Sequence, residues 1–296
     1  MSKIFDSLRK AGGQAANVAL PLIDKAALAK PAPGSADIAD PSGTPRSTAV
    51  EAAEIGARRI RVVKARPLDG LPVLPFDGTH PASAEQYRII RTKLVQHPAQ
   101  PRLVAISSPG AGDGKTISAL NIAGALSLKG EVKVLLVETD FRRSSFCRLL
   151  QLPDEPGLVD VLARRCSLDE AVVQVEQLPN LFLLGSGETR PDSSELLDAP
   201  FGRSVFQSMR KRFHFVVFDC PPVGSIADYE VVQAVADGVL LVLRPDHTNR
   251  ASAMEVFASV PQEKILGVVI NHVKPWFLWR AAASSYYYAD RNADQN

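Results

Sequence analysis

The feature that most constrains this fold is the repeated alternation of short apolar runs with helical segments over residues 81–275. Three of the runs, Val134–Val137, Val216–Phe218 and Val239–Leu243, are apolar throughout and do not alternate with polar residues. Such strands are typical of a parallel sheet that helices cover on both faces. The sequence therefore predicts an α/β fold with a doubly wound, mostly parallel sheet, whose ligand crevice lies at the carboxyl ends of the strands.

The expected elements follow one another in regular order along this region. The expected helices cover residues 84–96, 115–129, 201–212, 228–236 and 249–260, with helical patches between 143 and 173. The expected strands cover residues 103–107, 132–137, 181–184, 215–219, 238–243 and 265–270.

The segments outside this region have a different composition. Residues 3–30 place apolar side chains at helical spacing and predict a helix, either docked or frayed. Residues 31–80 are rich in proline and small residues, which favours a mostly disordered linker. We therefore expect a helical segment 1–30, a linker 31–80, a P-loop domain 81–275 and a flexible tail 276–296.

Composition excludes several classes of protein. The net charge of +2 gives no footprint for nucleic acid, and the three cysteines show no metal or redox spacing. No apolar run approaches the roughly 18–20 residues that a membrane-spanning helix needs. Asp6, Arg9 and Lys10 interrupt any apolar segment of a signal peptide. We expect a soluble protein of the reducing cytoplasm.

A glycine-rich segment, Ser107–Thr116, leaves an expected strand and opens an expected helix. This context is the one a phosphate-binding P-loop needs, because glycines let backbone N–H groups and the helix dipole approach an anion. Lys115 would contact the β- and γ-phosphates of ATP, and the Thr116 hydroxyl would bind Mg²⁺. The match is imperfect, since Pro109 stands where the motif has its first glycine, and a simple glycine-rich turn is the alternative. The residues expected to bind the nucleotide here are Gly110, Ala111, Gly112, Asp113, Gly114, Lys115 and Thr116.

Two acidic segments follow expected strands at the same edge of the sheet. Asp219 ends the strand 215–219 and can hold Mg²⁺ there, although a turn aspartate is the alternative. Glu138 and Asp140 alternate after the strand 132–137, so both can point into one crevice, where one could accept a proton and the other hold metal. An ion pair between Asp140 and Arg142 is the structural alternative.

These three segments together resemble the bacterial tyrosine kinases of capsule and exopolysaccharide loci. That family carries a Walker A motif, a second motif of apolar residues followed by D-x-D-x-R, and a Walker B motif ending in D-x-P. The corresponding segments here are Gly110–Thr116, Leu135–Arg142 and Val216–Pro221. The resemblance implies a P-loop fold, ATP and Mg²⁺ as cofactors, catalytic roles for Lys115 and the acidic residues, and a place for Arg142 in the nucleotide site.

Two further features extend the resemblance over about residues 81–288. Glu85, Arg88 and Arg91 match the family's E-x-x-R-x-x-R motif, which mediates ring-like self-association, although a solvated charged face is the alternative. The tail Tyr286–Tyr288 is similar to the tyrosine cluster that the family autophosphorylates. Asn271 matches the position where related ATPases read the adenine, and a strand-ending turn is its alternative.

The resemblance implies autophosphorylation of Tyr286, Tyr287 and Tyr288 within a ring-like homo-oligomer, which would regulate polysaccharide synthesis or export. The tail 276–296 is short for folding back onto its own site, so we expect transfer in trans to a neighbour in the ring. It also implies a membrane-anchored polysaccharide co-polymerase that recruits the chain to the inner face of the membrane, and a tyrosine phosphatase as a partner. Glu138 departs from the family's aspartate and is one methylene longer, enough to displace a base by about 1 Å. A partitioning-type ATPase and a non-catalytic ATP-bound scaffold are the two alternative functions.

Overall fold

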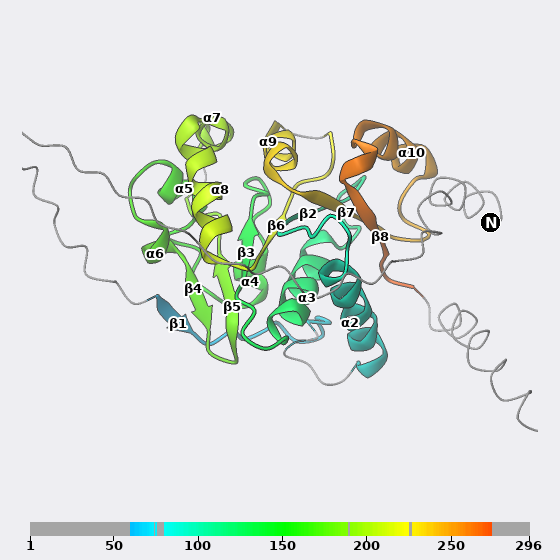
Figure 1. The fold of residues 1–296 in the computed structure, drawn as a ribbon, viewed down its shortest axis with the longest axis horizontal. Helices are drawn as coiled ribbons and strands as arrows, with labels where there is room; N and C mark the ends of the chain where they lie inside the picture. Colours follow the sequence, from blue (N-terminus) through cyan, green and yellow to red (C-terminus); the bar gives the residue numbers. More distant parts are fainter. Residues whose placement is uncertain (1–59, 74, 76–79, 189, 225–226, 274–296) are drawn as a thin grey trace, which may run out of the picture. The chain divides into compact units, whose positions relative to one another are not determined.

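The apolar runs of the sequence form an eight-stranded sheet (Figure 1). The computed structural model describes residues 60–273 except 74, 76–79, 189 and 225–226. The strand order is β1-β4-β5-β3-β6-β2-β7-β8, and every neighbouring pair is parallel except β4 and β5. The strands are β1 Arg61–Val63, β2 Leu103–Ser107, β3 Val134–Glu138, β4 Val173–Val175, β5 Leu178–Leu184, β6 Phe215–Asp219, β7 Gly238–Leu243 and β8 Ile265–Ile270.

Helices cover both faces of the sheet, as Figure 1 shows. They are α2 Pro81–Val95, α3 Lys115–Ser127, α4 Phe146–Leu149, α5 Leu158–Leu162, α6 Leu168–Ala171, α7 Ser193–Asp198, α8 Pro200–Arg212, α9 Ala227–Val235, α10 Arg250–Ser259 and the 3₁₀ turn η1 Gln262–Lys264. Because successive side chains of a strand point to opposite faces, Leu103 and Ala105 pack with α5 to α10, whereas Val104 and Ile106 pack with α2, α3 and α4. The expected doubly wound α/β fold is confirmed.

Local signals explain where several elements begin. Pro81 and Pro200 stand at the first turns of α2 and α8, where the missing N–H costs no helical hydrogen bond. Asn249 caps α10, because its side chain accepts a hydrogen bond from the N–H of Ala251 at 2.7 Å. Strands β2, β6, β7 and β8 have the bounds that the sequence predicts.

Residues 60–73 correct the predicted organisation. They fall inside the segment interpreted as linker, yet Arg61–Val63 pairs in parallel with β4, and Ala65 and Val73 are buried. Strand β4 and helix α7 were also not predicted. These pieces are short, and β1 depends on a partner more than 100 residues away, so local periodicity does not reveal it.

Asp237 anchors the edge of the sheet opposite the carboxyl ends of β2 and β7. Its Oδ2 accepts hydrogen bonds from the N–H groups of Arg102 at 2.8 Å and Leu103 at 2.9 Å, and its Oδ1 pairs with the Arg210 guanidinium. Burial acts to raise the pKa of Asp237, but the N–H groups of Leu103 and Arg102 and the Arg210 guanidinium hold it below its usual range.

The expected helix at 3–30, most of the expected linker and the tail with Tyr286–Tyr288 lie outside the described residues. Within the described part, each helix is too short or too polar to cross a bilayer.

Candidate active site

The glycine-rich loop joins β2 to α3 at the carboxyl end of the sheet. Gly112 and Gly114 have φ angles of +85° and +95°, in the left-handed region that favours glycine. A Cβ added at Gly114 would lie 1.9 Å from Asn271 Nδ2, so a larger residue would collide with that side chain. Lys115 and Thr116 open α3 directly after this turn. The backbone therefore has the form that a phosphate-binding loop requires.

Asp113 fastens this loop to the rest of the site. Its carboxylate accepts from the Gly110 N–H at 3.0 Å and from the Thr248 hydroxyl at 2.8 Å, and it lies 3.0 Å from His247 Nδ1. The Asn271 amide donates to the Asp113 carbonyl at 3.0 Å. The Asp113 side chain thus holds the loop in shape, so that Asp113 can contact a nucleotide only through its backbone. Asn271 braces the loop, while its expected contact with adenine stays a prediction.

The loop after β7 supplies contacts that the sequence analysis did not anticipate. Besides His247 and Thr248, Arg244 reaches the P-loop, where it donates to the Gly112 carbonyl at 3.3 Å. One signal could have found this loop: Pro245-Asp246 marks a turn directly after a buried strand, at the edge where ligands bind in α/β sheets.

Two buried carboxylates lie side by side next to the loop. Glu138 and Asp219 are directly paired in the register of β3 and β6, and their exposed fractions are 0% and 1%. Burial raises the pKa of Asp219 to about 7, although the Thr116 hydroxyl and Lys115 ammonium lower it and Asp140 raises it further. Burial and the Asp219 carboxylate raise the pKa of Glu138 to about 8. The pair therefore favours an added proton or a cation at neutral pH.

Asp219 has the properties of a metal ligand. Among the described residues, neither of its carboxylate oxygens has a hydrogen-bond partner of normal geometry. A buried, unpaired carboxylate is costly unless a ligand neutralises it. Carboxylate and hydroxyl oxygens are the ligands that Mg²⁺ prefers, and Thr116 offers its hydroxyl beside Asp219. The residues present therefore fit Mg²⁺.

Glu138 makes contacts that differ from its expected role. Its carboxylate accepts hydrogen bonds from the N–H of Ser145, from the N–H of Phe146 at 3.4 Å and from the Ser144 hydroxyl at 3.1 Å. The Ser145 hydroxyl in turn donates to the Thr116 hydroxyl oxygen at 3.2 Å. Glu138 therefore holds the turn before α4 against the candidate magnesium ligand.

The Asp140 side chain is slightly more exposed than that of Glu138. It is 8% exposed and accepts from the Arg143 N–H at 3.1 Å. Arg142 is exposed, and the ion pairs of the described residues do not include one between Arg142 and Asp140. The structural alternative for this pair is therefore not observed.

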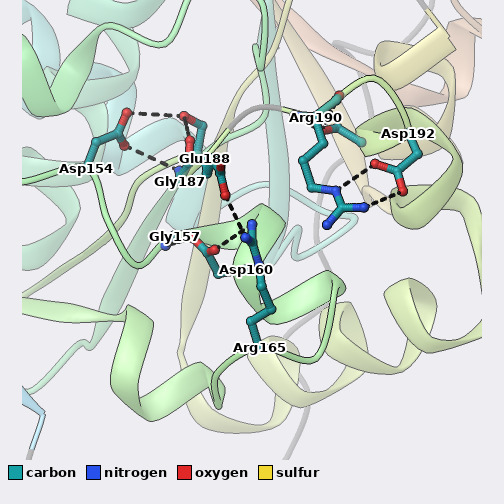
Figure 2. Close-up of polar contacts among 10 residues, drawn as sticks. Asp154, Gly157, Asp160, Arg165, Gly187, Glu188, Arg190 and Asp192 are labelled. Atoms are coloured by element: carbon teal, nitrogen blue, oxygen red, sulfur yellow. Dashed lines mark hydrogen bonds and ion pairs between the residues drawn. The ribbon is translucent and has the colours of Figure 1, made fainter.

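A polar network joins Glu138 to the loop that follows β5. The Ser144 hydroxyl spans Glu138 and Asp154, at 2.8 Å from the latter, and Asp154 also lies 3.5 Å from the Gly187 N–H. Figure 2 shows the next contact, in which Arg165 pairs with Asp160 at 2.9 Å and with Glu188 at 2.5 Å. The loop is therefore anchored on α5 and borders the acidic side of the site.

A second group of possible metal ligands lies in this network. Ligand atoms of Glu138, Cys147 and Asp154 all lie within 4.8 Å of one another. Burial, together with the Asp154 and Glu138 carboxylates, raises the pKa of the Cys147 thiol above its usual range. Because a protonated thiol is a poor metal ligand, this group fits a cation less well than Asp219 and Thr116 do.

The sequence and the fold of this chain are similar to those of known proteins, and these similarities assign it to a family. Residues 101–261, more than half of the chain, match the AAA domain family, to which the chain belongs. The tyrosine-protein kinase YwqD of Bacillus subtilis is 33% identical over an alignment of 203 residues, which covers 66% of this chain and 84% of YwqD. The chain is a member of the bacterial tyrosine-protein kinase family. The solved kinase domain of VpsO is 26% identical, with a TM-score of 0.59 over 65% of this chain and 96% of that domain.

Two further relatives mark the breadth of the likeness. The septum site-determining protein MinD of Synechocystis is 29% identical over an alignment of 178 residues, which covers 59% of this chain and 65% of MinD. The succinoglycan biosynthesis transport protein ExoP of Rhizobium meliloti is 28% identical over an alignment of 212 residues, which covers 69% of this chain but only 27% of ExoP. The chain thus corresponds to most of YwqD but to a small part of that transport protein.

Proposed function

We propose that this member of the family transfers the γ-phosphate of ATP in trans, to the C-terminal tyrosines of a neighbouring copy of the chain, with Mg²⁺ as cofactor. The observation that carries the proposal is the buried Asp219 carboxylate, which has no hydrogen-bond partner of normal geometry among the described residues and lies close to Thr116 and Lys115 of the P-loop. Phosphoryl transfer needs positioning and charge neutralisation, and these residue types supply both.

Each residue has a distinct part in the proposed reaction. The loop N–H groups and Lys115 bind the β- and γ-phosphates, and Thr116, Asp219 and Asp140 would hold Mg²⁺, directly or through water. Bound Mg²⁺ would neutralise charge on the phosphates. The tyrosine oxygen bonds to the γ-phosphorus as the bond from that phosphorus to the β–γ bridging oxygen breaks, and ADP leaves. Asp140 is the better acceptor of the tyrosine proton, because Glu138 is occupied by hydrogen bonds from the turn before α4.

Burial of the internal tyrosines supports the tail as acceptor. The chain has five tyrosines, of which Tyr286, Tyr287 and Tyr288 lie in the tail. Tyr229 is fully buried in α9. Tyr87 lies in α2, and burial raises the pKa of its hydroxyl. Neither internal hydroxyl is presented for transfer, so we expect phosphate on the tail alone.

The proposal includes self-association and a place at the membrane. Glu85 and Arg88 pair at 2.6 Å on the exposed side of α2, where both are available to a neighbouring copy in a ring, and Arg91, one turn further, is half-buried. The likeness to ExoP, a succinoglycan biosynthesis transport protein, supports a membrane-anchored polysaccharide co-polymerase as a partner of this chain. We propose that it acts at the inner face of the membrane on capsule or exopolysaccharide production, and that a tyrosine phosphatase reverses the modification.

The test separates this function from its alternatives. A full-length Lys115→Met chain, which lacks the P-loop cation, is mixed with an active chain truncated after Ala283 and with ATP labelled at the γ-phosphate. We expect label on the tail of the full-length partner only. The control is a full-length Lys129→Met chain, changed at an exposed lysine after α3, and it should label its tail as the parent does.

Three other results would contradict the proposal. Release of the label as inorganic phosphate without modified protein would indicate a partitioning-type ATPase. Bound ATP without turnover would indicate a scaffold. If the full-length parent labels itself in a separate reaction while the inactive full-length chain stays unlabelled in the mixture, transfer occurs within one chain.

A further inference from the structure

A groove with a volume of about 590 Å³ is lined by residues of α2 and of β8, the edge strand of the sheet. We call it the α2–β8 groove. Ile89 and Ile90 of α2 line one wall, and Leu266, Val268 and Ile270 line the other. Ile89 is 41% exposed and Ile270 is 45% exposed. Exposed apolar walls that face one another mark a binding surface.

The chain itself carries a segment that suits this groove. The described residues end at Val273, which lines the groove, and only Lys274 and Pro275 separate it from Trp276–Trp279, with the sequence Trp-Phe-Leu-Trp. Three residues of extended chain span roughly 10 Å, about the length of two helical turns. A link this short holds the apolar segment beside the groove at an effective concentration of millimolar order. We propose that Trp276–Trp279 of this chain docks into the α2–β8 groove.

The polar groups of the groove suit tryptophan as well. An indole ring buries a large apolar area but needs an acceptor for its N–H. Ser83 and Gln86 offer side-chain oxygens on the α2 wall, and an edge strand such as β8 has carbonyl groups without strand partners. The lining contains no aspartate or glutamate, so an aromatic segment meets no buried carboxylate there.

Docking would have a consequence for the tail. The seven residues from Trp279 to Tyr286 span at most about 25 Å, so the tyrosine cluster would stay within that radius of the groove. One end of the groove is lined by Asn271, which also bonds the P-loop. The docked segment would therefore limit how far the tyrosines reach from the domain that carries them. This docking does not depend on kinase activity, so the test below can fail while the proposed function stands.

Tryptophan fluorescence reports on this segment alone, because Trp276 and Trp279 are the two tryptophans of the chain. We expect the full-length protein to emit at shorter wavelength than a peptide of residues 274–296, and acrylamide to quench it several-fold less. The same result is expected for the inactive Lys115→Met protein, since docking needs no phosphoryl transfer.

Surface variants then identify the docking site. Ile89→Glu and Ile270→Glu each place a charge on one wall of the groove, and both should move the emission maximum and the quenching toward those of the peptide. Leu128→Glu makes the same kind of change at a residue that is 55% exposed and does not line the groove, and it should leave both readings unchanged. Circular dichroism verifies that all three variants are folded.

The opposite outcomes are equally clear. Parent emission and quenching equal to those of the peptide would refute docking. A blue-shifted parent spectrum that neither groove variant alters would place the segment elsewhere. A spectrum that reverts to that of the peptide on dilution would show that a second copy supplies or covers the segment, which refutes docking of the chain's own tail.

Discussion

Replacing Gly114 by alanine should disturb the P-loop through two separate physical effects. The backbone of Gly114 has a φ of +95°, which costs an L-residue roughly 1–2 kcal/mol. The new Cβ would also lie 1.9 Å from Asn271 Nδ2 and would push that side chain away. This displacement removes the hydrogen bond from Asn271 to the Asp113 carbonyl, which is worth about 0.5–1.5 kcal/mol. The expected loss of unfolding free energy is therefore about 1.5–3.5 kcal/mol.

A second glycine provides the matched control. Gly70 has a φ of +76°, and a Cβ added there meets no atom within 4 Å. Gly70→Ala should therefore show only the backbone cost of roughly 1–2 kcal/mol. Urea unfolding without nucleotide measures both variants, and calorimetry with Mg-ATP should show weakened binding for Gly114→Ala only.

A double-mutant cycle isolates the collision. Asn271→Ala alone removes the hydrogen bond, and in the double variant with Gly114→Ala the added methyl group no longer meets an amide. The double variant should therefore be less destabilised than the sum of the single variants by about 1 kcal/mol. Additive free energies, or equal losses for Gly114→Ala and Gly70→Ala, would refute this account of the loop.

Three further predictions concern other parts of the chain. Glu138→Asp should lower phosphorylation and not raise it, because the shorter side chain gives up its hydrogen bonds to the turn before α4; a gain in rate over the parent would instead identify Glu138 as a displaced base. Asp237→Asn should cost about 1–3 kcal/mol in urea unfolding at pH 7. The pKa of Asp237 is lower in the folded than in the unfolded state, so its contribution to the free energy of unfolding is present above the unfolded pKa of about 3.9 and is lost as the pH falls through the folded pKa. The difference in unfolding free energy between parent and variant should therefore narrow in acid. A difference that stays constant with pH would contradict this role of Asp237. Replacing Glu85, Arg88 and Arg91 of α2 together by alanine should yield monomers in light scattering and weaker tail phosphorylation at low protein concentration. A triple variant that assembles as the parent does would show that this charged face is only solvated.

The pattern of the sequence was sufficient for the central part of the fold. Strands β2, β6, β7 and β8 were predicted with their observed bounds, because a buried strand is a continuous apolar run between turn residues. The P-loop was also predictable, since strand, glycine-rich turn and helix are adjacent in the chain. The same reasoning placed Asp219 beside Lys115 and Thr116, because the carboxyl ends of parallel strands share one edge of the sheet.

Contacts between distant segments depended on the tertiary structure. The pairing of β1 with β4 joins residues more than 100 positions apart, and His247 contacts Asp113 across 134 positions. Local periodicity in the sequence therefore predicts neither contact. The direction of the Glu138 side chain depended on the turn before α4, whose N–H groups reach its carboxylate from a segment without a strong pattern. Local sequence specifies backbone shape through sterics and periodicity, whereas the partner of a buried polar group is selected only when the chain packs and its hydrogen bonds must be satisfied.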